Sequence, residues 1–415
     1  MSKRQQKEEL ILIKVIDAMC GSGKSTAIFK LMNSRFIEDL SSKYIYVTPF
    51  LSEIDTRIPE ELPLLDFKTP INVGNGKLES LKSLVKNGSN IATTHVLFSM
   101  LDVEVVDMIV DAGYILVIDE ALNCIRQESD LTKRDIEALL KSGMVNVDYG
   151  KRGKMCWNES FYPEHDGKYK DVRNMCHLGV AYTFKDRFLM FEIPPKLLQD
   201  LPEVYVLTYL FAGSDMRCWL EMNNIEYSYM DNFELGLVPE SELKAIVRDN
   251  LTILEPRSLK SDNQRNGTLS KTWFDKASKE PIKKYKNMLR SVVSHLKIKV
   301  GEVFWTTFKS HQTKLQGNSY TKGISDDMPA FLPLNTRATN DYRDYRLCMY
   351  ACNVFKSPVL VDYITSHGVN VNEDIYSLGE MIQFIWRGRI RQNQPMDVLI
   401  LSHRMRNLLK EWLYD

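Results

Sequence analysis

The chain lacks several features that would assign it to a specialised class. Its 415 residues contain no apolar run near the roughly 18–20 residues that cross a membrane. The charged first ten residues have no apolar signal-peptide core. Neither sign of charge is in excess, because 54 Lys and Arg residues balance 54 Asp and Glu residues. We therefore expect a cytoplasmic protein with no membrane partner, in which any nucleic-acid surface arises from local clustering of basic side chains.

Cysteine is also sparse, with seven scattered residues and no C-x-x-C pair. An odd number of isolated cysteines is typical of free thiols in a reducing compartment. A zinc site of Cys156, His165, Cys176 and His177 can be drawn, but its spacing matches no ordinary zinc finger. Cys348 and Cys352 lie one helical turn apart, and we interpret both as packing residues.

The strongest feature that is present is a strand that leads into AMCGSGKST, residues 18–26. Residues 10–16 are apolar and β-branched, as in a buried strand, and helix-forming residues begin at Lys24. This is the arrangement of a P-loop, in which backbone amides and a lysine hold nucleotide phosphates and a hydroxyl such as that of Ser25 binds Mg²⁺. An ordinary glycine turn is the alternative, since Ala18 replaces the usual first glycine. The residues expected to bind nucleotide are Ala18, Gly21, Ser22, Gly23, Lys24, Ser25 and Thr26.

A pair of carboxylates follows a second apolar strand. Residues 114–118 (YILVI) end in Asp119 and Glu120. At the carboxyl end of a parallel strand, Asp119 can hold the Mg²⁺ shell and Glu120 can polarise an attacking water. A solvated strand end is the alternative. The P-loop lies about a hundred residues upstream, which is domain-scale spacing, and the combination predicts nucleotide hydrolysis.

Strands and helices alternate through both halves of the chain, which predicts an α/β fold with parallel sheets. We expect domain 1 over residues 1–235, a linker region over 236–266 and domain 2 over 267–415. The alternation breaks between the two strands that flank residues 124–200, and we interpret this stretch as an insertion in domain 1. In domain 2 we expect strands at 303–307, 330–334 and 398–401 and helices at 281–296, 346–354, 380–387 and 405–413.

The second half has no P-loop but contains QFIWRGRIR, residues 383–391. An arginine here can stabilise charge on a transferring γ-phosphoryl group. A basic helix end, or a contact to a phosphate backbone, is the alternative. Further segments complete an ordered series: YVTPFLSE (46–53), ATTHVLF (92–98), LTYLFAGS (207–214), WTTFKS (305–310) and NTRATNDYRD (335–344).

Together with AMCGSGKST and IDEA (118–121), this series resembles motifs I to VI of superfamily 2 helicases along most of the chain. The RATN and Q…WR-x-R-x-R segments most resemble replication helicases of phages and the herpesvirus origin-binding helicase group. The resemblance implies two RecA-like domains in tandem, with ATP and Mg²⁺ as cofactors. The implied catalytic residues are Lys24, Asp119, Glu120, Gln383, Arg387, Arg389 and Arg391, with Ser25 and Asp119 at the metal. The implied nucleic-acid contacts are Thr48, Thr93, Thr94, Thr307 and Arg337.

Two departures from the helicase pattern stand out. LTYLFAGS replaces the usual Ser-Ala-Thr of motif III. The arginines of the last motif follow Gln383 by four, six and eight residues, where the family has four and seven. Arg387 fits the first position, and either Arg389 or Arg391 can be the arginine finger.

We therefore predict an ATPase that acts as a helicase or translocase on nucleic acid in phage-type replication or recombination, in the bacterial host cytoplasm. Single-stranded or forked DNA is preferred over RNA as partner, with a replication protein as a potential further partner. Two other functions stay open: a P-loop phosphotransferase, such as a nucleoside or polynucleotide kinase, and an ATP-binding switch with weak hydrolysis.

The insertion mixes basic and aromatic residues, a composition that suits a surface on which a strand stacks. The alternative is a small β-rich appendage whose aromatics form its own core. We expect the aromatics to be mainly core and the basic residues over 151–173, including Lys151, Arg152 and Lys154, to line the nucleic-acid path.

Overall fold

The computed structural model describes residues 13–72, 76–128, 130–160, 162–163, 167–325, 328–334 and 342–415. Contacts between residues divide the chain into two compact units. Unit 1 consists of Met1–Asp17, Lys24–Gly236 and Ser357–Val371, and unit 2 of Ala18–Gly23, Leu237–Lys356 and Asn372–Asp415. Over the described residues, no helix is both long and apolar enough to pass through a bilayer.

Unit 1 is built on a six-stranded sheet with the order β11-β1-β10-β4-β2-β3, in which every neighbouring pair is parallel. Its central strands are almost wholly buried because helices cover both faces, which explains their continuous apolar runs. The strands are β1 (Ile13–Asp17), β2 (Tyr44–Thr48), β3 (Ile91–Thr94), β4 (Ile115–Asp119), β10 (Glu203–Thr208) and β11 (Tyr227–Tyr229). The helices are α2 (Lys24–Glu38), α3 (Ile58–Glu61), α4 (Lys77–Lys86), α5 (His95–Phe98), α6 (Val103–Asp111), α9 (Lys196–Gln199) and α10 (Asp215–Met222).

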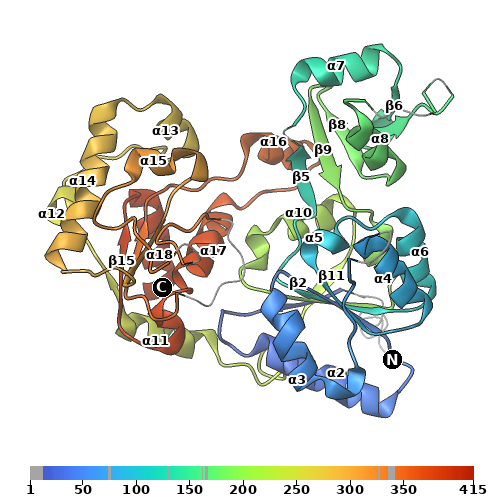
Figure 1. The fold of residues 1–415 in the computed structure, drawn as a ribbon, viewed down its shortest axis with the longest axis horizontal. Coiled ribbons are helices and arrows are strands. Elements are labelled where there is room, and N and C mark those ends of the chain that lie inside the picture. The colour runs from blue at the N-terminus through green and yellow to red at the C-terminus, as the bar shows by residue number, and fades with distance from the viewer. Residues whose placement is uncertain are drawn as a thin grey trace. The chain divides into compact units, whose positions relative to one another are not determined.

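The predicted insertion is a five-stranded antiparallel sheet, ordered β5-β9-β8-β7-β6, with two helices (Figure 1). Its own core includes Ile136, Leu139, Met155, Trp157 and Leu189. The aromatics Trp157, Tyr182 and Phe184 are buried, so they act as core rather than as a stacking surface. Its elements are β5 (Ile125–Glu128), α7 (Lys133–Lys141), β6 (Val145–Asp148), β7 (Lys154–Trp157), α8 (Lys170–His177), β8 (Ala181–Phe184) and β9 (Phe188–Glu192).

Unit 2 contains a four-stranded parallel sheet with the order β12-β15-β14-β13. A core that includes Phe274, Leu289, Trp305 and Met349 lies on one of its faces. The strands are β12 (Leu251–Ile253), β13 (Val303–Thr306), β14 (Leu347–Tyr350) and β15 (Met396–Ile400). The helices are α11 (Glu240–Asn250), α12 (Arg257–Lys260), α13 (Lys271–Lys276), α14 (Lys279–His295), α15 (Gln312–Leu315), α17 (Glu373–Ile385) and α18 (His403–Tyr414).

The predicted fold class, an α/β protein with two parallel-sheet domains and an insertion in the first, is confirmed. Two local predictions in unit 2 are wrong. The helix expected at 346–354 is strand β14, because a fully buried strand reads as a continuous apolar run and loses the alternation that identifies strands. The strand expected at 330–334 forms only an isolated bridge between Phe331 and Trp305.

One segment from the second half of the sequence belongs to unit 1. Helix α16 (Pro358–Ser366) buries Leu360, Tyr363 and Ile364 in the core of unit 1. Figure 1 shows α16 beside β5, at the base of the inserted sheet. The Tyr363 hydroxyl donates a hydrogen bond to the buried carboxylate of Glu192. Unit 1 is therefore completed by a piece of chain that sits between two stretches of unit 2.

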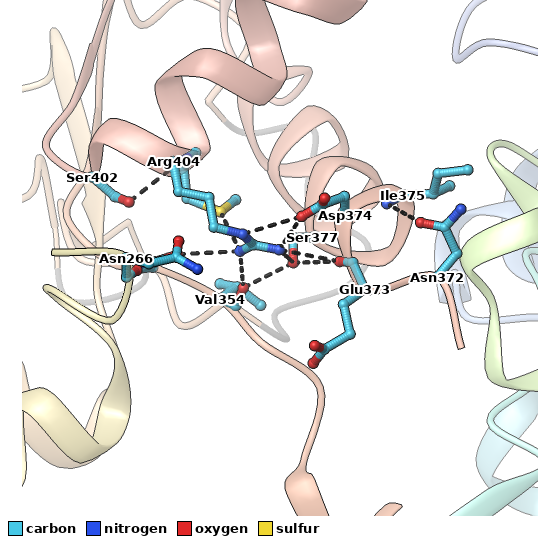
Figure 2. A network of polar contacts seen from close by, with 11 residues as sticks. Asn266, Val354, Asn372, Glu373, Asp374, Ile375, Ser377, Ser402 and Arg404 are labelled. Carbon is cyan, nitrogen blue, oxygen red and sulfur yellow. Dashed lines mark hydrogen bonds and ion pairs between the residues drawn. The ribbon is translucent and has the colours of Figure 1, made fainter. Parts of the chain in front are cut away.

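A polar network in unit 2 holds the chain just before and just after the segment Ser357–Val371 (Figure 2). Arg404 donates from Nη1 to the carbonyl of Val354 at 2.8 Å, just before the chain leaves unit 2. The same guanidinium donates from Nη2 to Asp374 at 2.6 Å, just after the chain returns. Ser377 adds a hydrogen bond to the Val354 carbonyl at 2.8 Å. One arginine thus fixes the exit and the return of the segment.

Candidate nucleotide site

The P-loop prediction falls on a strand, a turn and a helix. Strand β1 ends at Asp17 and α2 begins at Lys24, whose side chain is almost buried. Between them, Gly21 and Gly23 adopt φ angles of 84° and 96°, a backbone conformation that glycine reaches without strain. The loop closes through a hydrogen bond of 3.1 Å from the Ser22 amide to the Met19 carbonyl.

Within this loop, the hydroxyl of Ser22 is buried and has no hydrogen-bond partner among the described residues. A buried hydroxyl without a partner costs about 1–3 kcal/mol. A phosphate oxygen would satisfy it, at the start of a helix whose dipole favours an anion. The residues present therefore fit a nucleotide phosphate group.

The carboxylates stand at the same edge of the sheet. Strands β1 and β4 flank β10 in parallel, so the loop after β1 and Asp119 at the end of β4 lie at neighbouring carboxyl ends. Burial raises the pKa of Asp119 to about 7, and the charges of Glu120 and Glu53 act in the same direction. The Lys24 ammonium opposes them and lowers the pKa of Asp119. The structure thus brings Lys24, Asp119 and Glu120 together electrostatically.

Strained backbone marks this edge. Glu120 and Leu210 follow strands β4 and β10 with φ angles of 66° and 59°. Each costs about 1–2 kcal/mol for a non-glycine residue. Hydrogen bonds hold the strained turns in place, from the Glu120 amide to the Leu207 carbonyl at 2.8 Å and from the Phe211 amide to Asp17 Oδ2 at 3.1 Å. Strain of this kind gathers at functional sites, where the surroundings impose it.

Sequence reasoning missed two charged residues of this site, Glu53 and Arg57. Arg57 donates from Nη2 to the Thr26 hydroxyl at 2.8 Å and from Nη1 to Glu53 at 2.9 Å. It also donates from Nε to Glu61 at 2.6 Å. The single turn Glu53–Arg57 is a π-helix, a rare element that often occurs at functional sites. No spacing rule connects Thr26 with Arg57, so the sequence carried no signal for the contact.

The threonines expected to contact nucleic acid gather at the ends of β2 and β3, which pair Val47 with Thr93 and Thr48 with Thr94. Thr48 is buried, and its hydroxyl accepts the Phe50 amide at 3.2 Å. Thr94 caps α5 by accepting the Leu97 amide at 3.3 Å. The next residue, His95, contacts the carbonyl of Asp119 through Nε2 at 2.8 Å. His95 therefore connects the predicted nucleic-acid motif to the predicted metal ligand.

The predicted residues of unit 2 have separate surroundings. Thr307 is fully buried and donates its hydroxyl to the Ala351 carbonyl at 3.0 Å. The Arg387 guanidinium lies 5.0 Å from the centre of the Phe384 ring. Gln383, which directly precedes Phe384, is partly exposed. Arg389 donates from Nε to the Asp344 carbonyl at 2.8 Å, and Arg391 is exposed. Arg337 lies outside the described residues.

Metal-binding side chains are not clustered. Among the described residues, no group of three or more His, Cys, Asp and Glu side chains could hold a metal ion. The imagined zinc set includes His165, which lies outside the described residues, and an exposed Cys156. Magnesium needs no such cluster, since it is usually bound by one or two carboxylates together with substrate phosphates.

The insertion also contains an ion pair whose carboxylate is buried and whose arginine is partly exposed. Arg152 donates from Nη2 to Glu192 at 2.8 Å and from Nη1 to the Met222 carbonyl at 2.8 Å. The Glu192 side chain is completely buried, and the Tyr363 hydroxyl satisfies its other oxygen. Arg152 therefore joins the insertion to α10 and α16, and its removal would change stability together with any nucleic-acid affinity.

Known proteins match this architecture. Two family models match, described as the YonV C-terminal Rossmann-like domain over residues 245–413 and the YonV middle domain over residues 125–191. A solved structure titled XPD helicase aligns with a TM-score of 0.50 and 13% identity, covering 99% of this chain and 98% of that chain, which shows a shared helicase-like fold. The SPbeta prophage-derived uncharacterized protein YonV of Bacillus subtilis (strain 168) is 32% identical over 419 residues, 97% of this chain and 98% of that protein. This match over nearly the whole length of both proteins shows that the chain belongs to the YonV family.

Proposed function

We propose that this protein is an ATP-dependent helicase or translocase that acts on DNA in phage-type replication or recombination. The observation that carries the proposal is the sheet edge in unit 1 where Lys24 and Glu120 both act on the pKa of Asp119. The turn that joins β1 to α2 adds the Ser22 hydroxyl, which has no hydrogen-bond partner among the described residues. The helicase-like fold and the prophage relative support this choice over a kinase or a passive switch.

In this proposal, the loop amides and the Ser22 hydroxyl hold phosphate oxygens, and the Lys24 ammonium neutralises charge on the β- and γ-phosphates. Ser25 and Asp119 would hold Mg²⁺, which supplies further charge neutralisation. Glu120 orients the attacking water and accepts its proton. Gln383 and the arginines at 387–391 stabilise charge that develops on the γ-phosphoryl group, with Arg389 or Arg391 as the finger.

Nucleic acid would contact Thr94 and the backbone at the ends of β2 and β3, mainly through phosphates, so that binding tolerates many sequences. Thr48 and Thr93 would support these ends from inside, since both are buried. If nucleic-acid binding moves α5, the hydrogen bond from His95 to the Asp119 carbonyl would transmit that movement to Asp119. This contact gives hydrolysis a physical link to the strand.

Steady-state ATP hydrolysis, measured without nucleic acid and with matched single-stranded DNA and RNA, tests the proposal. A motor hydrolyses ATP faster when single-stranded nucleic acid is present, and the nucleic acid that stimulates hydrolysis more identifies the substrate. Phosphate transfer to an added nucleoside or polynucleotide would instead identify a kinase. Tight ATP binding without turnover under every condition would identify a switch, and either outcome would contradict the motor.

A further inference from the structure

Helix α14 concentrates positive charge in a chain that has none in excess. Its residues, Lys279–His295, include five Lys or Arg side chains and one acidic side chain, Glu280, whereas the whole chain balances 54 against 54. Lys279, Lys283, Lys286 and Arg290 follow one another at spacings of four, three and four residues. Such spacing places side chains along one face of a helix. The charge is therefore arranged as a stripe.

The packed face of α14 fixes the orientation of this stripe. Tyr285, Met288, Leu289, Val292 and Val293 are buried in the core that lies on the sheet of unit 2. Figure 1 shows α14 on the outside of unit 2, next to α13 and α15. With the apolar face packed, Lys279, Lys283 and Arg290 are exposed and Lys286 is partly exposed.

Among the described residues, the four side chains of the stripe form no ion pair. The neighbouring Lys284, which lies off the stripe, forms an ion pair with Asp262. Four cations on one rigid helix repel one another, an arrangement that an anionic partner would relieve.

We propose that this stripe on α14 binds the phosphate backbone of nucleic acid. At a rise of 1.5 Å per residue, the stripe spans about 16 Å. One strand of duplex DNA carries about five phosphates along 16 Å of the duplex axis, so the stripe is long enough to meet several phosphates of one backbone. Asn287, Ser291 and Ser294 are exposed on the same helix and are side chains that donate hydrogen bonds to phosphate.

A lipid surface is a poorer match than nucleic acid. A helix that lies in a membrane interface presents a free apolar face together with its basic face. The apolar face of α14 is already buried, and no large hydrophobic side chain of this helix is exposed. The stripe thus offers charge and hydrogen bonds without an apolar anchor, which suits a phosphate backbone.

This inference rests on the proposed nucleic-acid function and assigns it a surface outside the helicase-like motifs. The test is the variant K279Q/K283Q/K286Q/R290Q, with binding to a fluorescent single-stranded oligonucleotide measured across a series of salt concentrations. Each phosphate contact to a single strand makes the slope of log K against log salt more negative by about 0.7, so loss of four contacts makes the slope shallower by about 2.8. The charge-preserving variant K279R/K283R/K286R should keep the parent slope.

The matched control is Lys284→Gln, which removes one charge from the same helix but off the stripe, and should leave the slope within about one contact of the parent. Thermal unfolding checks that each variant is folded. A folded quadruple variant with the parent slope would overturn the α14 surface while leaving the motor intact. A parent protein that shows neither strand binding nor strand-stimulated hydrolysis would overturn the proposed function as well. Loss of binding to phosphatidylserine vesicles, with strand binding unchanged, would assign the stripe to lipid instead.

Discussion

The two parallel sheets of this protein are alike in architecture but differ in what their polar residues do. At the carboxyl edge of the sheet in unit 1, Lys24 and Glu120 both act on the pKa of Asp119, and the backbone at Glu120 is strained. After strands β13 and β14 of unit 2, Thr307 donates to the Ala351 carbonyl and Asn353 donates to the Asn266 carbonyl at 2.6 Å. One edge collects ionisable groups, among them a carboxyl whose pKa is raised, and the other uses polar side chains to hold loops.

Two sheets of the same architecture can therefore differ in which one carries the ionisable residues of a candidate site. In unit 1, the raised pKa of Asp119 identifies a group that a ligand would relieve, and the turn between β1 and α2 adds the Ser22 hydroxyl, which has no hydrogen-bond partner among the described residues. In unit 2, the contribution to catalysis would come from the arginines at 387–391, which follow a helix rather than a strand. The following predictions separate these contributions.

The largest expected effect is on the arginines of unit 2. The double variant R389A/R391A should lower kcat by about 10³–10⁵-fold with little loss of ATP affinity, because an arginine finger acts on the transition state. Single-turnover hydrolysis and nucleotide-binding measurements check this. The single variants identify the finger: Arg389→Ala also loses the hydrogen bond to Asp344, so its melting temperature must be compared with that of Arg391→Ala. Hydrolysis at the parent rate in the double variant would show that neither arginine takes part in ATP hydrolysis.

Glu120→Gln tests the edge in unit 1. This variant should bind ATP normally and lose about 10²–10⁴-fold in hydrolysis, because only the acceptor for the water proton is removed. Lys24→Ala should in addition weaken ATP binding, since its charge lies on the phosphates. Glu242→Gln, an exposed carboxylate on α11, is the matched control in unit 2. Near-normal turnover in Glu120→Gln would reject its assignment as the base.

Arg152→Ala should destabilise the protein by about 3 kcal/mol, because it leaves the Glu192 carboxylate buried without its cation. Chemical denaturation monitors the change. Lys151→Ala, at the neighbouring exposed position, should be nearly neutral for stability and isolates any effect on strand affinity. Equal stability of the two variants would mean that the ion pair of Arg152 with Glu192 contributes nothing to the free energy of unfolding.

His95→Ala is expected to have the smallest effect. The ratio of strand-stimulated to basal hydrolysis should fall about 2–10-fold, the value of one hydrogen bond of about 0.5–1.5 kcal/mol. His95→Gln can still donate to the Asp119 carbonyl and should recover part of the ratio. A ratio unchanged in both variants would show that this contact does not carry the strand signal.

How much the sequence predicted depended on how local each signal was. The strand and helix around residues 18–26, the strand that ends at Asp119 and helix α14 are encoded in short runs of neighbouring residues, and these predicted elements match the observed ones. The roles of the P-loop residues and of Asp119 and Glu120 stay predictions. Strand β14 was predicted as a helix because burial on both faces removed its alternation. The contacts of Arg57 with Thr26 and of His95 with Asp119 join residues that are distant in sequence, and no propensity or spacing rule encodes such pairs.

Helix α16 makes unit 1 a folding unit assembled from separate stretches of chain. Burying an apolar side chain contributes about 1.5–3 kcal/mol, so Leu360, Tyr363 and Ile364 together contribute about 5–9 kcal/mol, comparable with the whole stability of a typical domain. The family model over residues 245–413, which otherwise covers unit 2, therefore includes the segment Ser357–Val371 that completes unit 1. A fragment that ends at residue 236 would lack this helix, and a synthetic peptide of residues 357–371, added in trans, is the partner that would restore it.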